Sequence, residues 1–336
     1  MRVFITGSAG FIGFHLADRL LRDGHTVCGY DAMTPYYDVS LKRARHERLK
    51  RFDAFSAHEA DLGDAGRLEA AIGGFGPEIV VHLAAQAGVR YSIEQPQTYI
   101  DTNITGTFNL LEILRKTPPR HLLFASTSSV YGANPDMPFA EADRTDQPMS
   151  LYAATKKAGE AMSHSYAHLF GIPTTCFRFF TVYGPWGRPD MALFKFAAAM
   201  LEKRPIEVFG EGRMGRDFTY VDDLVEAITR LIPVVPEAKK PVLQQGVTDS
   251  LSPVAPWRVV NIAGGAPQGL MDYIAALEKA LGVTAEKRML PMQPGDVART
   301  HADAGLLRAL TGYVPDTPIE TGVAAFAEWF RDWRRT

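Results

Sequence analysis

The sequence begins with a strand-like run that leads directly into three glycines, in TGSAGFIG, followed by an amphipathic segment, FIGFHLADRLL. A glycine-rich turn between a strand and a helix is typical of dinucleotide-binding domains, because a pyrophosphate can approach the free amides of the helix. Gly7 allows the tight turn, Gly10 the close approach of the phosphate, and Gly13 the close packing of the helix. The predicted contacts of this turn are Gly7, Gly10, Phe11, Ile12 and Gly13.

Short apolar runs alternate with amphipathic segments through the first half of the chain: RVFIT, HTVCGYD, EIVVHLAA and HLLFAST have the character of strands. Parallel strands need connections long enough to hold a helix, so this alternation predicts an α/β fold with a doubly wound parallel sheet. From about Arg178 the order is less regular, and RVVNIAGG again resembles a buried strand. We expect a dinucleotide-binding domain over 1–177, to which a strand and a helix return around 220–265. A smaller C-terminal α/β substrate domain should occupy most of 178–336.

Asp31 follows the second predicted strand at the spacing of a carboxylate that binds the hydroxyls of the adenosine ribose. This favours NAD as the cofactor. The 2'-phosphate of NADP would meet like charge there, unless Lys42 or Arg43 folds back to neutralise it. The ends of the third and fourth predicted strands supply further candidates for the cofactor site, namely Asp61, Leu62, Ala84, Ala85 and Gln86.

The charge balance excludes a bulk attraction to nucleic acid or to anionic lipid. The 336 residues include 36 Lys and Arg against 38 Asp and Glu, for a formal net charge of -2. No apolar run approaches membrane-spanning length, and the N-terminus lacks the pattern of a secretory signal. Cys28 and Cys176 are far apart and have no metal-ligand spacing. We therefore expect a small-molecule partner, no nucleic-acid or membrane partner, no metal and a cytoplasmic location.

Tyr152 and Lys156 are four residues apart in the predicted helix LYAATKKAGEAMSHSYAHLF, so both side chains lie on one face. A phenol with a pKa of about 10 is a poor base near neutral pH, and a nearby ammonium stabilises the phenolate. The segment FASTSSVYG places Thr127, Ser128 and Ser129 at the carboxyl end of the fifth predicted strand, where ligands of open α/β sheets bind. This combination predicts proton transfer beside the dinucleotide, and it argues against a non-catalytic dinucleotide sensor.

Together, TGSAGFIG, Asp31, STSSVYG and YAATK resemble the extended short-chain dehydrogenase/reductase superfamily, and in particular its nucleotide-sugar epimerase and dehydratase branch. The resemblance spans nearly the whole chain. It implies that Thr127 bonds the sugar 4-hydroxyl, that Tyr152 is the acid/base, and that Lys156 binds the nicotinamide ribose and tunes the tyrosine. It also places Asn103, in DTNITGTFNLLE, among the positions of the cofactor site, where it helps to order the active-site helix.

Several segments are similar to those of UDP-glucuronate 4-epimerases: PYYDVSLKRARHERL, QAGVRYSIEQP, RFFTVYGPWGRPDM and SPVAPWRVVNIAGG. Ser128 and Ser129 stand where a sugar dehydratase carries an acidic pair, and Thr181 stands where UDP-galactose epimerases typically have Asn. The resemblance implies reversible C4 epimerisation of UDP-glucuronate to UDP-galacturonate through a 4-keto intermediate, with transient reduction of bound NAD. A UDP-glucose/UDP-galactose 4-epimerase and a UDP-glucuronate decarboxylase remain alternatives.

Oxidation at C4 of a glucuronate gives a β-keto acid, which loses carbon dioxide when its carboxylate bond aligns with the carbonyl π system. An epimerase must therefore hold the carboxylate in another orientation. Arg188, in GPWGRPD, offers a guanidinium fork suited to a carboxylate. The candidate hydroxyl donors are Thr127, Ser128, Ser129 and Thr181.

The resemblance also suggests how the nucleotide is held and how the chain assembles. Arg216, in GRMGRDFTYVDD, matches the family arginine that binds the nucleotide diphosphate. Asp296 and Arg299 lie where the family closes over the uridine ribose, but Gln293 stands where galactose epimerases place an arginine, so this contact stays open. The helices predicted over about 97–116 and 152–170 resemble those of the superfamily's four-helix dimer interface, and we expect a homodimer.

Overall fold

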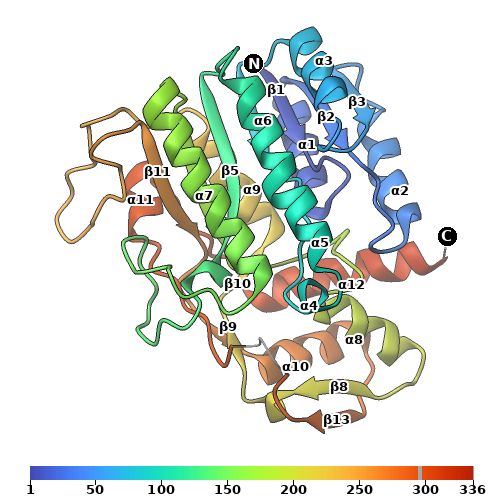
Figure 1. Ribbon diagram of the computed structural model, residues 1–336. Coiled ribbons are helices and arrows are strands. Elements are labelled where there is room, and N and C mark those ends of the chain that lie inside the picture. The colour runs from blue at the N-terminus through green and yellow to red at the C-terminus, as the bar shows by residue number, and fades with distance from the viewer. Residues whose placement is uncertain (294–296, 336) are drawn as a thin grey trace.

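The central sheet of the protein consists of seven parallel strands, which are β1 (Arg2–Thr6), β2 (Thr26–Asp31), β3 (Phe55–Glu59), β4 (Ile79–His82), β5 (His121–Thr127), β6 (Thr174–Phe179) and β11 (Trp257–Ile262). The computed structural model describes residues 1–293 and 297–335. The strand order is β11-β6-β5-β4-β1-β2-β3, so the direction of the winding reverses between β1 and β4 (Figure 1). In such sheets, ligands bind outside the carboxyl ends of the strands at this reversal.

Apolar side chains alternate along the strands, so each face of the sheet buries its own core. Val3 and Ile5 belong to the core on one face, and Phe4 between them belongs to the core on the other. Helices therefore have to cover both faces. The first face carries α1 (Phe11–Arg22), α2 (Val39–Leu49), α9 (Val221–Leu231) and α11 (Gly305–Thr311), and the second carries α3 (Ala65–Phe75), α6 (Thr107–Leu114) and α7 (Leu151–Phe170). The predicted doubly wound parallel sheet is confirmed.

Helix α7 has local signals at both ends. The side chain of Ser150 accepts a hydrogen bond from the Ala153 amide at 3.1 Å, and Gly171 ends the helix in the left-handed conformation. The stretch before α6 is less regular than the sequence predicted, because it consists of three consecutive segments. These segments are α4 (Tyr91–Glu94), α5 (Pro96–Tyr99) and the π-helical η1 (Ile100–Gly106).

A second, smaller group of strands and helices lies below the large sheet (Figure 1). Its paired strands are β7 (Thr181–Tyr183) with β10 (Phe218–Tyr220), β9 (Gly215–Arg216) with β12 (Gln268–Gly269), and β8 (Ile206–Phe209) with β13 (Lys287–Leu290). Its helices are α8 (Ala192–Leu201), α10 (Leu270–Leu281) and α12 (Ile319–Arg335), with the short 3-10 segment η3 (Gly210–Gly212). Tyr273 and Phe326 are buried in the core of this group. Within residues 1–293 and 297–335, every helix is too short or too polar to cross a membrane.

Candidate active site

The glycine turn after β1 brings the start of α1 against the sheet. Gly7 has a φ of 76°, and a Cβ at this position would lie 2.7 Å from the amide nitrogen of Ala84. A Cβ on Gly13 would lie only 2.1 Å from the carbonyl oxygen of Gly7. Helix α1 begins at Phe11, and Gly10 caps it without a side chain. The first-turn amides of the helix therefore keep their capacity to bind an anion.

Two backbone amides fix the carboxylate of Asp31 at the end of β2. Its Oδ2 accepts from the amide of Ala9 at 2.9 Å, and its Oδ1 accepts from the amide of Met33 at 2.9 Å. Lys42 lines the same cavity, and its Nζ donates to the carbonyl oxygen of Thr34 at 2.9 Å. Burial lowers the pKa of Lys42, although Asp31 opposes this effect. A carboxylate held in this way suits a ribose diol, so the donor set of the turn and Asp31 fits a dinucleotide.

A cavity of about 280 Å³ opens from the glycine turn along the carboxyl ends of the strands. The structure brings most of the predicted cofactor and catalytic residues together in its lining, which includes Gly7, Gly10, Phe11, Ile12, Gly13, Asp31, Asp61, Leu62, Ala84, Ala85, Gln86, Thr127, Tyr152 and Lys156. Arg188, which was predicted to bind the substrate, lines the same cavity. Asn103 lies behind this lining, where its Oδ1 accepts from the Gln86 amide at 2.8 Å and its Nδ2 donates to Oγ1 of Thr155 in α7 at 3.0 Å. Asn103 thus ties the loop after β4 to the helix that carries Tyr152.

Thr127, Tyr152 and Lys156 meet at the end of this cavity. Thr127 ends β5, and its side chain hydrogen-bonds the Tyr152 hydroxyl. Burial raises the pKa of Tyr152, while this hydrogen bond and the positive charge of Arg188 lower it. Burial also lowers the pKa of Lys156 to about 8, although Cys176 and Glu160 oppose this effect. Arg188 is thus a cation that favours the phenolate, and the tuning of Tyr152 by Lys156 stays a prediction.

Ser128 and Ser129 follow Thr127 in the 3-10 helix η2 (Ser128–Tyr131) and lie outside the lining of the first cavity. The hydroxyl of Thr127 donates to Oγ of Ser129 at 3.2 Å and accepts from the Ser129 amide at 3.2 Å. Ser129 therefore orients the Thr127 hydroxyl.

A second cavity, of about 830 Å³, adjoins the first between the large sheet and the smaller group of strands. Thr181 and Arg216, which the sequence assigned to the substrate, line this cavity, and so does Gln293. Nη1 of Arg216 donates to the carbonyl oxygen of Gly215 at 2.8 Å. Asp296 lies outside the described residues. Of the predicted substrate residues, Thr127 and Arg188 line the first cavity, Thr181 and Arg216 line the second, and Ser128 and Ser129 line neither.

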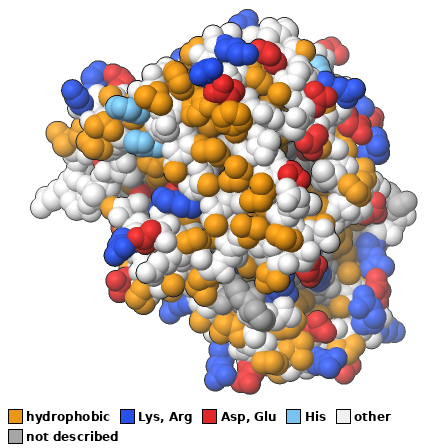
Figure 2. Space-filling view, in the orientation of Figure 1, with side chains coloured by type: hydrophobic (Ala, Val, Ile, Leu, Met, Phe, Trp, Pro, Cys, Tyr) orange, Lys and Arg blue, Asp and Glu red, His pale blue; other side chains and the backbone are white. Residues whose placement is uncertain are grey.

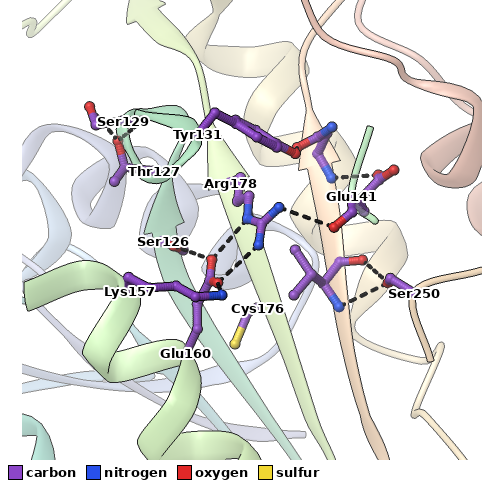
Figure 3. A network of polar contacts seen from close by, with 12 residues as sticks. Ser126, Thr127, Ser129, Tyr131, Glu141, Lys157, Glu160, Cys176, Arg178 and Ser250 are labelled. Carbon is purple, nitrogen blue, oxygen red and sulfur yellow. Dashed lines mark hydrogen bonds and ion pairs between the residues drawn. The ribbon is translucent and has the colours of Figure 1, made fainter. Parts of the chain in front are cut away.

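A buried ion pair supports the strand and the helix that carry the predicted catalytic groups (Figure 3). The carboxylate of Glu160 in α7 accepts from Nε and Nη2 of Arg178 in β6 at 2.9 and 3.0 Å, and from the hydroxyl of Ser126 in β5 at 2.6 Å. Lys157 adds a third cationic contact at 3.1 Å. Although burial alone would raise the pKa of Glu160, Arg178 holds it below the ordinary value. Ser126 precedes Thr127, so the pair fixes the end of β5.

The sequence patterns missed Arg45, a fully buried side chain in α2. Its Nη1 donates to the carbonyl oxygen of Ala9 in the glycine turn at 2.8 Å, and its Nη2 donates to the carbonyl oxygens of Trp186 and Gly187. Arg45 thus links the cofactor turn to the loop that carries Arg188. The signal in the sequence is a helical stripe of buried positions in α2, Leu41, Lys42, Arg45, His46 and Leu49, in which polar residues occupy core positions.

Comparisons with known proteins agree with this architecture. The chain is 58% identical over 336 residues to a probable UDP-glucuronate 4-epimerase of Rhizobium meliloti (strain 1021), covering 100% of this chain and 98% of that protein. The crystal structure of the UDP-glucuronic acid 4-epimerase from Bacillus cereus, in complex with UDP-glucuronic acid and NAD, matches with a TM-score of 0.84 at 33% identity. That match covers 99% of this chain and 100% of the other chain.

Proteins that act on a neutral sugar share the fold. The UDP-glucose 4-epimerase of Thermus thermophilus, in complex with NAD, matches with a TM-score of 0.83 at 29% identity, covering 98% of this chain and 99% of that chain. The fold alone therefore leaves the choice of sugar open. Residues 3–242 match the NAD dependent epimerase/dehydratase family. This match and the full-length relatives show that the chain belongs to the NAD dependent epimerase/dehydratase family.

Proposed function

We propose that this protein interconverts UDP-glucuronate and UDP-galacturonate by epimerisation at C4 through a 4-keto intermediate. The observation that carries the proposal is the meeting of Thr127, Tyr152 and Lys156 with Arg188 in one cavity. The first three residues supply proton transfer, and Arg188 supplies the charge that a uronate needs and a neutral sugar does not. The relatives named UDP-glucuronate 4-epimerase support the same substrate.

The cofactor of this reaction is NAD, held by the amides of the glycine turn, by Asp31 and by Lys156. When bound, NAD would supply a reversible hydride acceptor for C4 of the sugar, with no net change of the cofactor. Tyr152 accepts the proton of the sugar 4-hydroxyl and later returns it. Thr127 hydrogen-bonds the hydroxyl of Tyr152 and so orients this hydroxyl and the sugar 4-hydroxyl toward each other. Asn103 fixes the position of α7 beside the cofactor cavity through its hydrogen bond to Thr155.

The sugar nucleotide extends from the first cavity into the second. Arg216 binds the diphosphate in the second cavity, and Thr181 faces the sugar there. Arg188 holds the uronate carboxylate away from the geometry that releases carbon dioxide, and the hydroxyls of Thr127, Ser128, Ser129 and Thr181 stay its predicted further donors. The proposal thus assigns NAD to residues 1–177 with the returning strand and helix around 220–265. It assigns the nucleotide sugar mostly to residues 178–336.

We also propose that the protein forms a homodimer through the helices over about 97–116, which end in α6, and over about 152–170 in α7. Hydrophobic side chains gather on the face where these two helices lie in front of the sheet (Figure 2). Phe108 of α6 is 47% exposed, and Leu169 and Phe170 of α7 are 65% and 40% exposed, so both helices present large apolar side chains to a partner. A cytoplasmic location suits the free, buried thiols of Cys28 and Cys176. Light scattering of Phe108→Lys tests the dimer, because a charge at a buried helix contact should yield monomers.

The test of the activity is incubation of the purified protein with UDP-glucuronate and, separately, with UDP-glucose. Anion-exchange chromatography identifies the products, and trapped carbon dioxide measures decarboxylation. We expect UDP-galacturonate, little carbon dioxide and little turnover of UDP-glucose. Formation of a 4-keto pentose with stoichiometric carbon dioxide would identify a decarboxylase instead. If UDP-glucose is the better substrate and Arg188→Ala leaves its turnover unchanged, the enzyme is a neutral-sugar epimerase.

A further inference from the structure

Arg188, the predicted donor to the substrate carboxylate, already holds a carboxylate of the protein. Its Nε donates to Oδ1 of Asp190 at 3.0 Å, and its Nη2 donates to Oδ2 at 2.5 Å. The hydroxyl of Tyr36 donates to the same Oδ2 at 3.1 Å, and the guanidinium lies 5.8 Å from the centre of the Tyr36 ring. We call Tyr36, Arg188 and Asp190 the Arg188 triad. Although burial alone would lower the pKa of Arg188, Asp190 raises it, so the guanidinium is charged.

The Arg188 triad lies where the two cavities adjoin. Arg188 lines the first cavity, Asp190 lines the second, and Tyr36 lines both. The positive charge of Arg188 also acts on the phenol of Tyr152, so the guanidinium is close to the group that exchanges the proton of the sugar 4-hydroxyl. The sugar ring of a nucleotide sugar that spans both cavities would therefore lie beside the Arg188 triad.

A guanidinium has two edges that can each hold a carboxylate by a pair of hydrogen bonds. Asp190 uses the edge formed by Nε and one N–H of Nη2. The edge formed by Nη1 and the second N–H of Nη2 then points away from Asp190. We propose that Asp190 and Tyr36 are positioning residues, which hold Arg188 by one edge so that its other edge receives the carboxylate of the uronosyl sugar. This inference rests on the proposed function, since it requires a uronate substrate.

The charges around the triad permit a second carboxylate. Asp190 alone neutralises Arg188, and two carboxylates on one guanidinium would leave an excess of negative charge. Lys42 and Arg45 are close enough to Arg188 for their charges to interact with it. Arg45 also holds the backbone of Trp186 and Gly187, just before Arg188. Asp31 also acts on Lys42 and Arg45, but the three cations outnumber the carboxylates of Asp190 and Asp31. The incoming carboxylate therefore enters a region of net positive charge, and its direction is set by an edge that the protein has already oriented.

The orientation matters because the oxidised sugar is a β-keto acid. In the unwanted reaction the C5–C6 bond breaks, its electron pair passes into the C4 carbonyl to give an enolate, and carbon dioxide leaves. A proton then adds to C5 and yields a 4-keto pentose. The bond breaks only when it aligns with the carbonyl π system. A guanidinium that rotates freely would let the carboxylate reach this alignment, whereas one fixed by Asp190 keeps the carboxylate out of it.

The experiment compares the wild type with Asp190→Asn and Tyr36→Phe, all assayed with UDP-glucuronate. Asp190→Asn keeps the shape but removes the charge and one hydrogen bond of the fork, and Tyr36→Phe removes the hydroxyl contact to Asp190. The ratio of carbon dioxide to UDP-galacturonate should rise about tenfold in Asp190→Asn, and by a smaller factor in Tyr36→Phe. KM for UDP-glucuronate should rise, while the NAD content of the purified protein stays unchanged. A merely structural role would lower total turnover without moving the product ratio.

Asp146→Asn is the matched control. Asp146 pairs with Arg144 at the same sequence spacing, but on the exposed surface, so this variant should leave the ratio unchanged. An unchanged ratio in both triad variants would overturn the inference while leaving the proposed function intact. If Asp190→Asn does not fold, Tyr36→Phe decides the question alone. If the wild type forms no UDP-galacturonate, the proposed function fails, and this inference fails with it.

Discussion

Removal of the Glu160 carboxylate should test how the buried ion pair with Arg178 supports the candidate active site. The side chain of Glu160 is 1% exposed and that of its partner Arg178 is 3% exposed. Water therefore cannot solvate one charge if the other charge is removed. In Glu160→Gln the amide oxygen can still accept a hydrogen bond, but the amide nitrogen faces cationic donors. Breaking a buried ion pair in this way leaves an uncompensated charge and costs about 3–5 kcal/mol.

The same substitution should also change the chemistry. Ser126, which donates to Glu160 at 2.6 Å, directly precedes Thr127, and Glu160 raises the pKa of Lys156 against burial. Without this charge the pKa of Lys156 falls below its present value of about 8, because burial is then less opposed. Lys156 loses its proton at a lower pH, so the alkaline fall of kcat/KM should begin at a lower pH than in the wild type.

Equilibrium urea unfolding and a pH profile of kcat/KM measure these two effects. Asp249→Asn breaks another buried pair, with Arg258 near the amino end of β11, and should lose stability without shifting the pH profile. Glu69→Gln breaks an exposed pair with Lys116 and should cost at most about 1 kcal/mol. If Glu160→Gln costs no more than Glu69→Gln, the reasoning about the buried pair is refuted. If its pH profile matches that of Asp249→Asn, the link to Lys156 is refuted.

Three further outcomes can be measured. Gly13→Ala places a methyl group 2.1 Å from the carbonyl oxygen of Gly7, so the free energy of unfolding measured in urea should fall by about 1–3 kcal/mol and copurified NAD should be lost. Gly73→Ala is the control: there is open space around Gly73, so both stability and NAD content should stay unchanged. Burial raises the pKa of Glu141 to about 7, so the folded protein binds a proton that the unfolded chain has released. The contribution of this proton to the free energy of unfolding is complete below about pH 4.5 and is lost as the pH rises through 7, which lowers that free energy by about 3 kcal/mol. Glu141→Gln has no carboxyl group to titrate, so its free energy of unfolding should not show this decrease. Equal pH dependence in both proteins would contradict the reasoning. Tyr152→Phe should lower kcat by about 10²–10⁴-fold in the epimerase assay with NAD content unchanged, and a smaller loss would mean that another group carries the proton.

Local patterns were enough to predict the sheet, the glycine turn and the face of α7 that lines the first cavity. Gly7, Gly13 and Asp31 lie within one strand–turn–helix–strand unit, and Tyr152 and Lys156 share a face because a helix repeats every 3.6 residues. These relations depend on short-range backbone geometry, so the order of residues along the chain contains them.

The partners of the charged side chains do not follow from such patterns. Arg45 binds the carbonyl oxygen of Trp186, 141 residues away, and Glu160 finds Arg178 on a neighbouring strand. The sequence identified Arg188 as a candidate donor to a carboxylate. Its pair of hydrogen bonds with Asp190 forms only when the loop that carries both residues is packed between the two cavities. A buried charge takes whichever acceptor the packed fold brings within reach after water is excluded, and that choice is made by contacts between distant segments.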